Sequence, residues 1–182
     1  ISTKENWKIL DISDATIKFQ NINFSYKSNL NNIVLKDINI DIAGRKMTAL
    51  VGHSGSGKST ILNLIPRIYD ADSGEILIDN QKVQNLNLKS LRKEISIVDQ
   101  NTTLFDDTIF NNIKYAKPDA SDEEIFTAAK ISMCTDFIEK LENKFQTVIG
   151  ENGVKLSGGE KQRLSIARAL LKDSKIILLD EA

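Results

Sequence analysis

The chain has 182 residues, with 24 basic and 25 acidic side chains, a net charge of −1 and one cysteine. This length suffices for one globular domain, or a domain with a subdomain, that buries most of its apolar surface. The lone Cys134 has no internal partner, which excludes a disulfide scaffold and favours a reducing, cytosolic setting. No apolar run approaches the roughly 20 residues that span a bilayer, and no basic stripe suited to a nucleic-acid backbone is present.

The first half of the chain predicts an alternation of strands and one helix. Residues 1–16 are polar and mixed, which indicates a linker entering the domain; because Ile1 follows no initiator Met or signal peptide, we expect a segment of a longer protein. Alternating apolar residues predict a strand with a bulge at 17–26 and a second strand at 38–42. A short apolar strand is expected at 47–51, followed by a glycine-rich turn and a helix over 58–68.

The second half predicts further strands around a helical block. A capping-box pattern at Ser121 and Glu124 marks one helix start inside this block. Strands alternating with helices indicate the α/β class with a largely parallel sheet. The predicted strands are 75–78, 95–98 and 175–179, and the predicted helical segments are 88–94, 108–144 and 158–171.

A phosphate-binding loop is predicted between the strand at 47–51 and the helix after it. Residues 52–59 read Gly-His-Ser-Gly-Ser-Gly-Lys-Ser, which satisfies the pattern G-x-x-x-x-G-K-[ST]. Its glycines let backbone N–H groups point at phosphate oxygens, and the following helix presents its positive end to the same charge. The predicted ligand residues of this loop are Gly52, Ser54, Gly55, Ser56, Gly57, Lys58 and Ser59.

Side chains at the end of the loop have distinct predicted roles. Lys58 would reach the β- and γ-phosphates, the Ser59 hydroxyl suits a Mg²⁺ ligand, and Thr60 would add a hydrogen bond to the α-phosphate. The only histidine, His53, lies in the variable part of the loop, and we assign it no role.

A second pair of glycines and an acidic strand end complete the pattern. The run Leu156–Glu160, Leu-Ser-Gly-Gly-Glu, opens a predicted helix, where an anion site competes with an ordinary serine N-cap. The apolar strand that follows delivers Asp180 and Glu181 at its carboxyl end, where ligands gather in open α/β sheets. Asp180 fits an acceptor for Mg²⁺ or its waters, and Glu181 fits a base that polarises an attacking water.

Together, and in this order, these motifs resemble the nucleotide-binding domain of ABC-type ATPases over residues 17–182. The resemblance implies a P-loop NTPase core with a parallel sheet, an N-terminal antiparallel β subdomain and an inserted α-helical subdomain at about 104–171. It also implies that residues 1–16 connect to an upstream transmembrane domain. The pairs Thr108-Ile109 and Asn112-Ile113, with the segment 147–153, point to the exporter branch of the family.

The resemblance also assigns roles residue by residue. It places Tyr26 on the adenine and Gln100 at the catalytic metal, and Glu151 beside the transmembrane partner. It implies a head-to-tail dimer in which ATP lies between the phosphate loop of one chain and the signature of the other. The signature residues are Ser157, Gly158 and Gly159.

We therefore expect a Mg²⁺-dependent ATPase that drives export from the cytoplasmic face of a bacterial inner membrane, without nucleic acid as a partner. A soluble ABC ATPase acting on nucleic acid or ribosomes is the alternative, with a small-metabolite kinase or a non-catalytic nucleotide-binding module as weaker ones. The sequence departs from the family pattern at two positions. Glu160 stands where the family more often has Gln, and Asp99 stands where it frequently has Pro. Because the family's D-loop and switch histidine would follow Ala182, we expect the natural protein to continue and residues 1–182 alone to hydrolyse ATP poorly.

Overall fold

A computed structural model describes residues 7–26, 33–100 and 102–180. The chain divides into two compact units, Ile1–Ile95 and Ser96–Ala182. Among the helices within the described residues, none combines the length and the apolar character that crossing a membrane requires.

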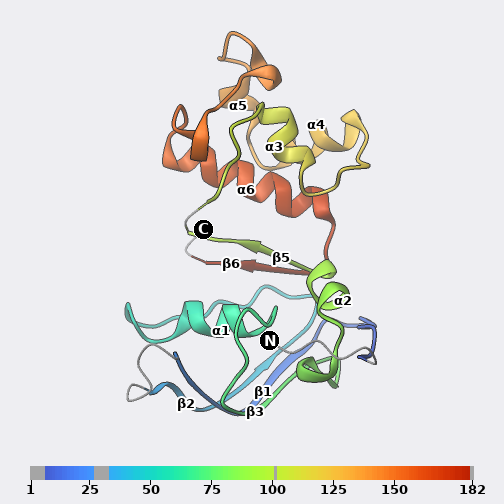
Figure 1. Cartoon of the computed structure of the whole chain (residues 1–182), viewed down its shortest axis with the longest axis vertical. Helices are drawn as coiled ribbons and strands as arrows, with labels where there is room; N and C mark the ends of the chain where they lie inside the picture. The colour runs from blue at the N-terminus through green and yellow to red at the C-terminus, as the bar shows by residue number, and fades with distance from the viewer. Residues whose placement is uncertain (1–6, 27–32, 101, 181–182) are drawn as a thin grey trace. The chain divides into compact units, whose positions relative to one another are not determined.

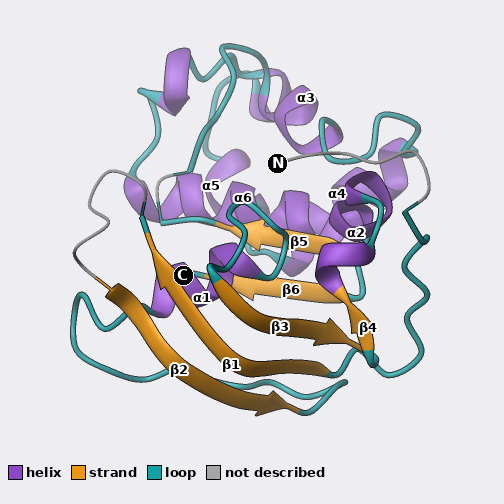
Figure 2. Ribbon diagram, turned by 60° about the horizontal axis from the view of Figure 1, so that its bottom comes forward, coloured by secondary structure: helices purple, strands orange, loops and turns teal. Residues whose placement is uncertain are grey.

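The first unit contains an antiparallel sheet of four strands in the order β2-β1-β3-β4 (Figure 2). Strand β1 alternates buried and exposed side chains, and its phase changes after Phe19, where the pairing with β2 shifts register and Asn21 has a φ of 50°. The predicted bulge and the antiparallel β region are thus confirmed. The strands are β1 (Ile17–Ser25), β2 (Ile33–Ile42), β3 (Ser73–Ile78) and β4 (Gln81–Lys82).

The helices of this unit are shorter than the periodicity suggests. Helix α1 (Lys58–Leu64) ends four residues before the predicted boundary. The physical reason is Pro66, which disfavours the helical conformation of the residue before it, and Arg67, which has a φ of 52° while its N–H bonds to Leu64 O at 3.1 Å. The turn η2 (Val83–Asn85) and helix α2 (Leu88–Lys93) follow, the latter close to its prediction.

One predicted strand of the first unit is wrong. Residues 47–51 have no strand assignment and pair with no strand in the part of the chain that the structure describes. Met47 and Val51 are 97% and 90% exposed. An apolar run becomes a strand only where a neighbour supplies hydrogen-bond partners, and the four paired strands of this unit offer none to this segment.

The second unit begins with two strands side by side. Strand β5 (Ile95–Val98), at the boundary between the units, pairs with β6 (Ile176–Leu179). Their arrows run in the same direction in Figure 1, which matches the predicted parallel sheet. The N–H of Asp180 extends the pairing by donating to Val98 O at 2.9 Å.

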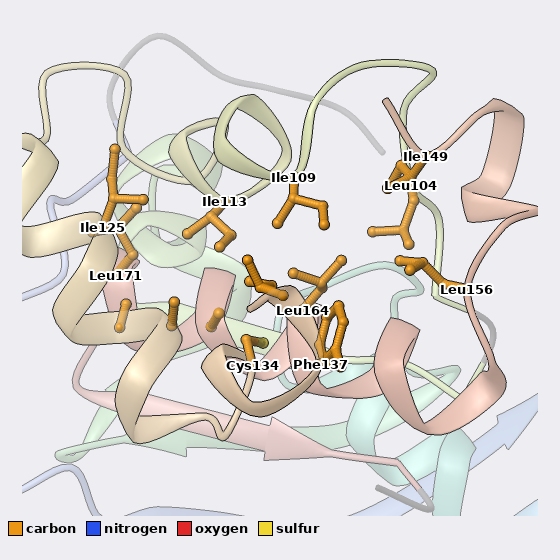
Figure 3. Close-up of a cluster of buried hydrophobic side chains, with 14 of the residues drawn as sticks. Leu104, Ile109, Ile113, Ile125, Cys134, Phe137, Ile149, Leu156, Leu164 and Leu171 are labelled. Atoms are coloured by element: carbon orange, nitrogen blue, oxygen red, sulfur yellow. The ribbon is translucent and has the colours of Figure 1, made fainter. Parts of the chain in front are cut away.

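Helices form the rest of the second unit and bury a core of its own (Figure 3). Leu164 of the longest helix lies in this core with Ile109, Ile125 and the free thiol of Cys134, all fully buried. The predicted helical block, its capping box at Ser121 and the α/β class are confirmed. The helical segments are α3 (Ile109–Lys114), α4 (Asp122–Ile131), α5 (Thr135–Ile138), η3 (Lys144–Gln146), η4 (Glu151–Gly153) and α6 (Gly158–Lys172).

Candidate functional site

In the first unit, the glycine-rich loop depends on two glycines in the left-handed region. Gly55 and Gly57 have φ values of 79° and 90°, which other residues adopt only at a cost. Gly57 is also buried, and a Cβ there would lie 2.6 Å from the Cδ2 of Leu35 on β2. Loop and sheet therefore approach each other at a point where only glycine fits.

Lys58 folds back over this loop and links it internally. Its Nζ donates to the carbonyl oxygens of Gly52 and His53 at 3.0 and 2.9 Å. An ammonium group has three N–H donors, so these bonds leave one for an oxygen of an incoming anion. The loop thus holds a positive charge among exposed backbone groups, and this arrangement suits a phosphate chain.

Two predicted residues, Tyr26 and Thr60, share one hydrogen bond. The Tyr26 hydroxyl lies 2.9 Å from the Thr60 Oγ1, and Thr60 is buried in α1. The Tyr26 ring meets Phe24 and Tyr69 edge to face, with centroids 4.9 and 5.2 Å away. Sequence reasoning did not single out Tyr69, whose isolated position after α1 carries no motif.

Ser59 is exposed in the first turn of α1, so its hydroxyl is accessible from solvent. Mg²⁺ in nucleotide sites commonly takes one or two protein oxygens and completes its shell with phosphates and water. Within the described ranges, no three His, Cys, Asp or Glu side chains gather as a metal site. In the first unit, the hydroxyl of Ser59 therefore suits an ion that is held mainly by phosphates.

In the second unit, Ser157, Gly158 and Gly159 form the N-terminus of α6 and are all exposed. Ser157 accepts from the N–H of Glu160 at 3.4 Å, while its own N–H and hydroxyl both donate to Glu160 Oε2 at 2.7 Å. These bonds from Ser157 lower the pKa of the Glu160 carboxyl. The signature turn is therefore a complete capping box with a negative charge beside its hydroxyl.

Gln100 and Asp180 follow the two strands of the parallel pair. Gln100 follows β5 and Asp180 follows β6, and the carboxyl ends of parallel strands meet at the same edge. The N–H of Asp180 donates to Val98 O, two residues before Gln100, at 2.9 Å. Glu181, the predicted base, lies outside the described residues.

Glu151 is exposed at the start of η4, in the predicted partner-contacting segment. This segment is held by backbone bonds from Ile109 N to Thr147 O and from Ile149 N to Asp107 O, both 3.1 Å. Sequence reasoning also missed Arg168, whose guanidinium donates to Thr103 O and Asn112 O. This residue carried no signal in the sequence beyond its place on a helix.

These two units contain a glycine-rich phosphate loop before a helix, and an acidic residue at the carboxyl end of a parallel strand, features of a P-loop nucleotide-binding protein. The profile of the family described as "ABC transporter" matches residues 35–182. The chain belongs to that family, and the resemblance stated from the motifs is confirmed.

Relatives of the chain carry the name of a lipid A-core flippase. It is 54% identical over 174 residues to the "ATP-dependent lipid A-core flippase" of Pectobacterium atrosepticum, covering 95% of this chain and 30% of that protein. The protein of the same name from Escherichia coli K12 is 48% identical over 179 residues, covering 98% and 31%. The chain thus spans about a third of the length of the curated relatives it matches.

A solved structure agrees over the full chain. The "Structure of a bacterial Atm1-family ABC exporter with ATP bound" has a TM-score of 0.95 and 41% sequence identity, covering 100% of this chain and 31% of that one. The likeness favours the exporter interpretation over the soluble ABC ATPase.

Proposed function

We propose that this chain is the ATP-binding and ATP-hydrolysing motor domain of a bacterial ABC exporter. The observation that carries the proposal is the Lys58 ammonium held inside the glycine-rich loop by the Gly52 and His53 carbonyls. A compact charge fixed among backbone donors is the device that binds the β- and γ-phosphates in P-loop proteins.

The first unit would bind the nucleotide itself. Lys58 and the loop N–H groups would hold the phosphates, and the Ser59 hydroxyl would be a ligand of the metal ion. That ion, when bound, neutralises charge on the phosphate oxygens. Tyr26 would stack on the adenine, and its hydroxyl would release Thr60 for the α-phosphate, since the two hydroxyls bond to each other in this structure.

The second unit would supply the chemistry of hydrolysis. Gln100 and Asp180, which follow the two parallel strands, would hold the metal ion. Glu181 would accept a proton from the water that attacks the γ-phosphate. The attack breaks the bond between the γ-phosphorus and its bridging oxygen and yields ADP and phosphate.

A second copy of the domain would complete each site. Ser157, Gly158 and Gly159 are exposed at a helix N-terminus, where backbone N–H groups attract a γ-phosphate from the partner. Two such contacts related by a two-fold axis give two sites per dimer. In this proposal residues 1–16 link residues 17–182 to a transmembrane domain, the helical subdomain spans about 104–171, and the domain lies on the cytoplasmic face of the inner membrane.

The proposal is tested in the full-length transporter in lipid vesicles, with Mg²⁺ and ATP. Lys58→Met is expected to lower ATP hydrolysis by about a hundredfold or more, since it removes the charge that holds the phosphates. Lys46→Met, which removes an exposed lysine outside the loop, serves as the matched control and should retain the parent rate. Equal rates for Lys58→Met and the parent would refute the nucleotide site.

Glu181→Gln tests the hydrolytic step separately from binding. The variant should bind ATP as tightly as the parent and accumulate as an ATP-bound closed dimer, because the amide is a poor proton acceptor. Binding is measured with labelled ATP and dimer closure by cross-linking of the signature turn to the partner's loop. A variant that turns over ATP at the parent rate would show that another residue acts as the base.

We also infer that residues 1–182 alone hydrolyse ATP more slowly than the full-length protein does. The segment 47–51, which leads into the phosphate loop, pairs with no described strand, so the loop is anchored on one side only. Turnover per site, measured for both proteins, tests this; equal rates would contradict it.

A further inference from the structure

Residues 103–108, called the 103–108 loop below, lie three residues beyond Gln100 and make no secondary structure apart from one bridge, Thr108 to Val148. Such a stretch would ordinarily be mobile, yet its backbone is held by side chains from two helices. One is Arg168 of α6, and the other is Asn112 of α3. Neither contact belongs to the nucleotide site described above.

Arg168 spans three oxygens of this region with its guanidinium. Its Nη1 donates to Thr103 O at 2.6 Å, its Nε to Asn112 O at 2.7 Å, and its Nη2 to Asn112 Oδ1 at 2.5 Å. The guanidinium carbon also lies 5.4 Å from the centre of the Phe105 ring. One side chain of α6 therefore contacts both ends of the segment that runs from the loop into α3.

Asn112 holds the other side of the loop from within the core. It is 1% exposed, and its Nδ2 donates to Phe105 O at 3.0 Å and Thr108 O at 2.9 Å. Its Oδ1 accepts from the N–H of Phe105 at 3.0 Å as well as from Arg168. A single buried amide thus mimics a pairing strand for the loop backbone.

The 103–108 loop is in turn hydrogen-bonded to residues 147–153. Asn152 N donates to Leu104 O at 3.1 Å, and Ile149 N to Asp107 O. A Cβ on Gly153 would lie 2.6 Å from the Leu104 Cδ1, so the two segments touch where only glycine fits. Leu104 and Ile149 lie side by side in the buried cluster of Figure 3.

The electrostatics of Arg168 suggest a role beyond packing. Within the described part of the chain no carboxylate pairs with it, and burial lowers the pKa of its guanidinium. A partly buried charge with neutral acceptors gains little stability relative to an apolar side chain, whereas the planar guanidinium fixes one geometry of the atoms it contacts. Arg168 therefore contributes a defined position of the loop rather than a large gain in stability.

We propose that Arg168 is a positioning residue that locks the 103–108 loop to α6, so that the Gln100 side of the site and the Ser157–Gly159 turn move as one body. Helix α6 carries the signature at its first turn and Arg168 farther along, and a helix transmits displacement along its length. This inference rests on the proposed function, because both ends of the linkage act on ATP. It adds that the segment 147–153 follows the same motion.

The test uses the full-length transporter in vesicles with Arg168→Lys and the control Lys175→Met. Lysine keeps the charge but has no fork, so it reaches one oxygen instead of three. Without nucleotide, amide hydrogen exchange in the 103–108 loop should rise about tenfold in Arg168→Lys, as expected for losing charge-assisted hydrogen bonds. With ATP, kcat should fall about fivefold while KM stays within about twofold, because Lys58 and its loop are unchanged. Lys175→Met, an exposed residue after α6, should change none of these.

Two further variants keep the test decisive if a substitution destabilises the protein. Arg168→Met should lower kcat more than Arg168→Lys does. Asn112→Ala should raise exchange in the same loop, and its effect should be less than additive with that of Arg168→Lys, because both belong to one hydrogen-bond network. A rise of exchange throughout the protein, together with a rise in KM, would instead show a general loss of fold and would overturn the positioning role.

The outcomes also separate this inference from the proposed function. Two results would overturn the positioning role alone. One is that Arg168→Lys leaves hydrogen exchange in the 103–108 loop unchanged. The other is that Arg168→Lys leaves ATP hydrolysis unchanged while Lys58→Met abolishes it. Hydrolysis that does not depend on Lys58 would refute the proposed function, and exchange in the loop would then report a structural contact only.

Discussion

At the scale of single residues, the phosphate loop depends on Gly57. We predict that Gly57→Ala lowers the free energy of unfolding by about 2 kcal/mol or more, since alanine meets both the strained φ of 90° and the contact with Leu35. Gly55→Ala is the matched control, because Gly55 has a similar φ but no atom within 4 Å of its Cβ position. Denaturant unfolding of both variants should rank Gly57→Ala as the more damaging; the opposite ranking would contradict the close approach.

Glu160 places a negative charge beside the hydroxyl of the signature serine. We predict that Glu160→Gln strengthens ATP-driven dimer closure about two- to fivefold, because the amide oxygen keeps the bond from Ser157 N and the charge that repels a phosphate is gone. The ATP concentration for half-maximal closure measures this in the full-length protein. The control is Glu123→Gln, the same change in the first turn of α4. Weaker closure in Glu160→Gln alone would mean that the carboxylate itself assists binding.

At the scale of elements, the segment before β1 is docked rather than loose. Lys8 forms a bridge with Leu86, and Leu10 N donates to Ser90 Oγ at 3.1 Å. The Arg67 guanidinium lies over the Trp7 ring, with its Cζ 4.9 Å from the centre of that ring. Residues 7–16 of the predicted linker therefore contact the rest of the first unit.

Asp79, in the turn after β3, fixes the end of this segment. Its carboxylate accepts from the N–H groups of Ser13, Asp14, Ala15 and Thr16 at 2.8 to 3.0 Å. Burial disfavours ionisation of this carboxyl, but the bonds from Thr16, Ala15 and Asp14 outweigh it and hold the pKa far below its usual range. A carboxylate here does for the chain what a bound anion does in a backbone nest.

This contact predicts a pH dependence. Because the folded-state pKa of Asp79 is depressed, its contribution to stability is complete above the ordinary carboxyl pKa of about 3.9 and is lost as the pH falls through the folded-state value. Asp79→Asn should therefore lower the free energy of opening of the amides 13–16 by about 2 kcal/mol, so that they exchange faster at neutral pH. The substitution should also remove the acid sensitivity of their exchange. Asp41→Asn, an exposed change on β2, should do neither. Retained acid sensitivity in Asp79→Asn would assign it to another group.

At the scale of the whole molecule, the net charge of the chain bears on whether it binds nucleic acid. A net charge of −1 provides no field that would release counterions from a nucleic-acid backbone. We predict that labelled DNA and RNA show no change in anisotropy with the full-length protein at low salt, and that neither stimulates its ATPase. Binding with a steep salt dependence would revive the soluble alternative.

Sequence and tertiary structure contributed differently to these features. The capping box at Ser121 and the bulge near Asn21 were predicted correctly because each depends on residues within a few positions of one another. The segment 47–51 was predicted wrongly because its periodicity is apolar but its partner strand is not a local property. Helix α1 was predicted too long because apolar spacing continues past Pro66.

The sequence by itself determined the family and the fold class, since the order of the motifs and the spacing of apolar residues suffice for these. Only the tertiary structure placed Lys58 on the loop carbonyls, joined Tyr26 to Thr60, and brought Arg168 to Asn112, 56 residues away. Contacts of this kind depend on how the chain closes in space, and loop closure leaves no periodic signal in the residues that it brings together.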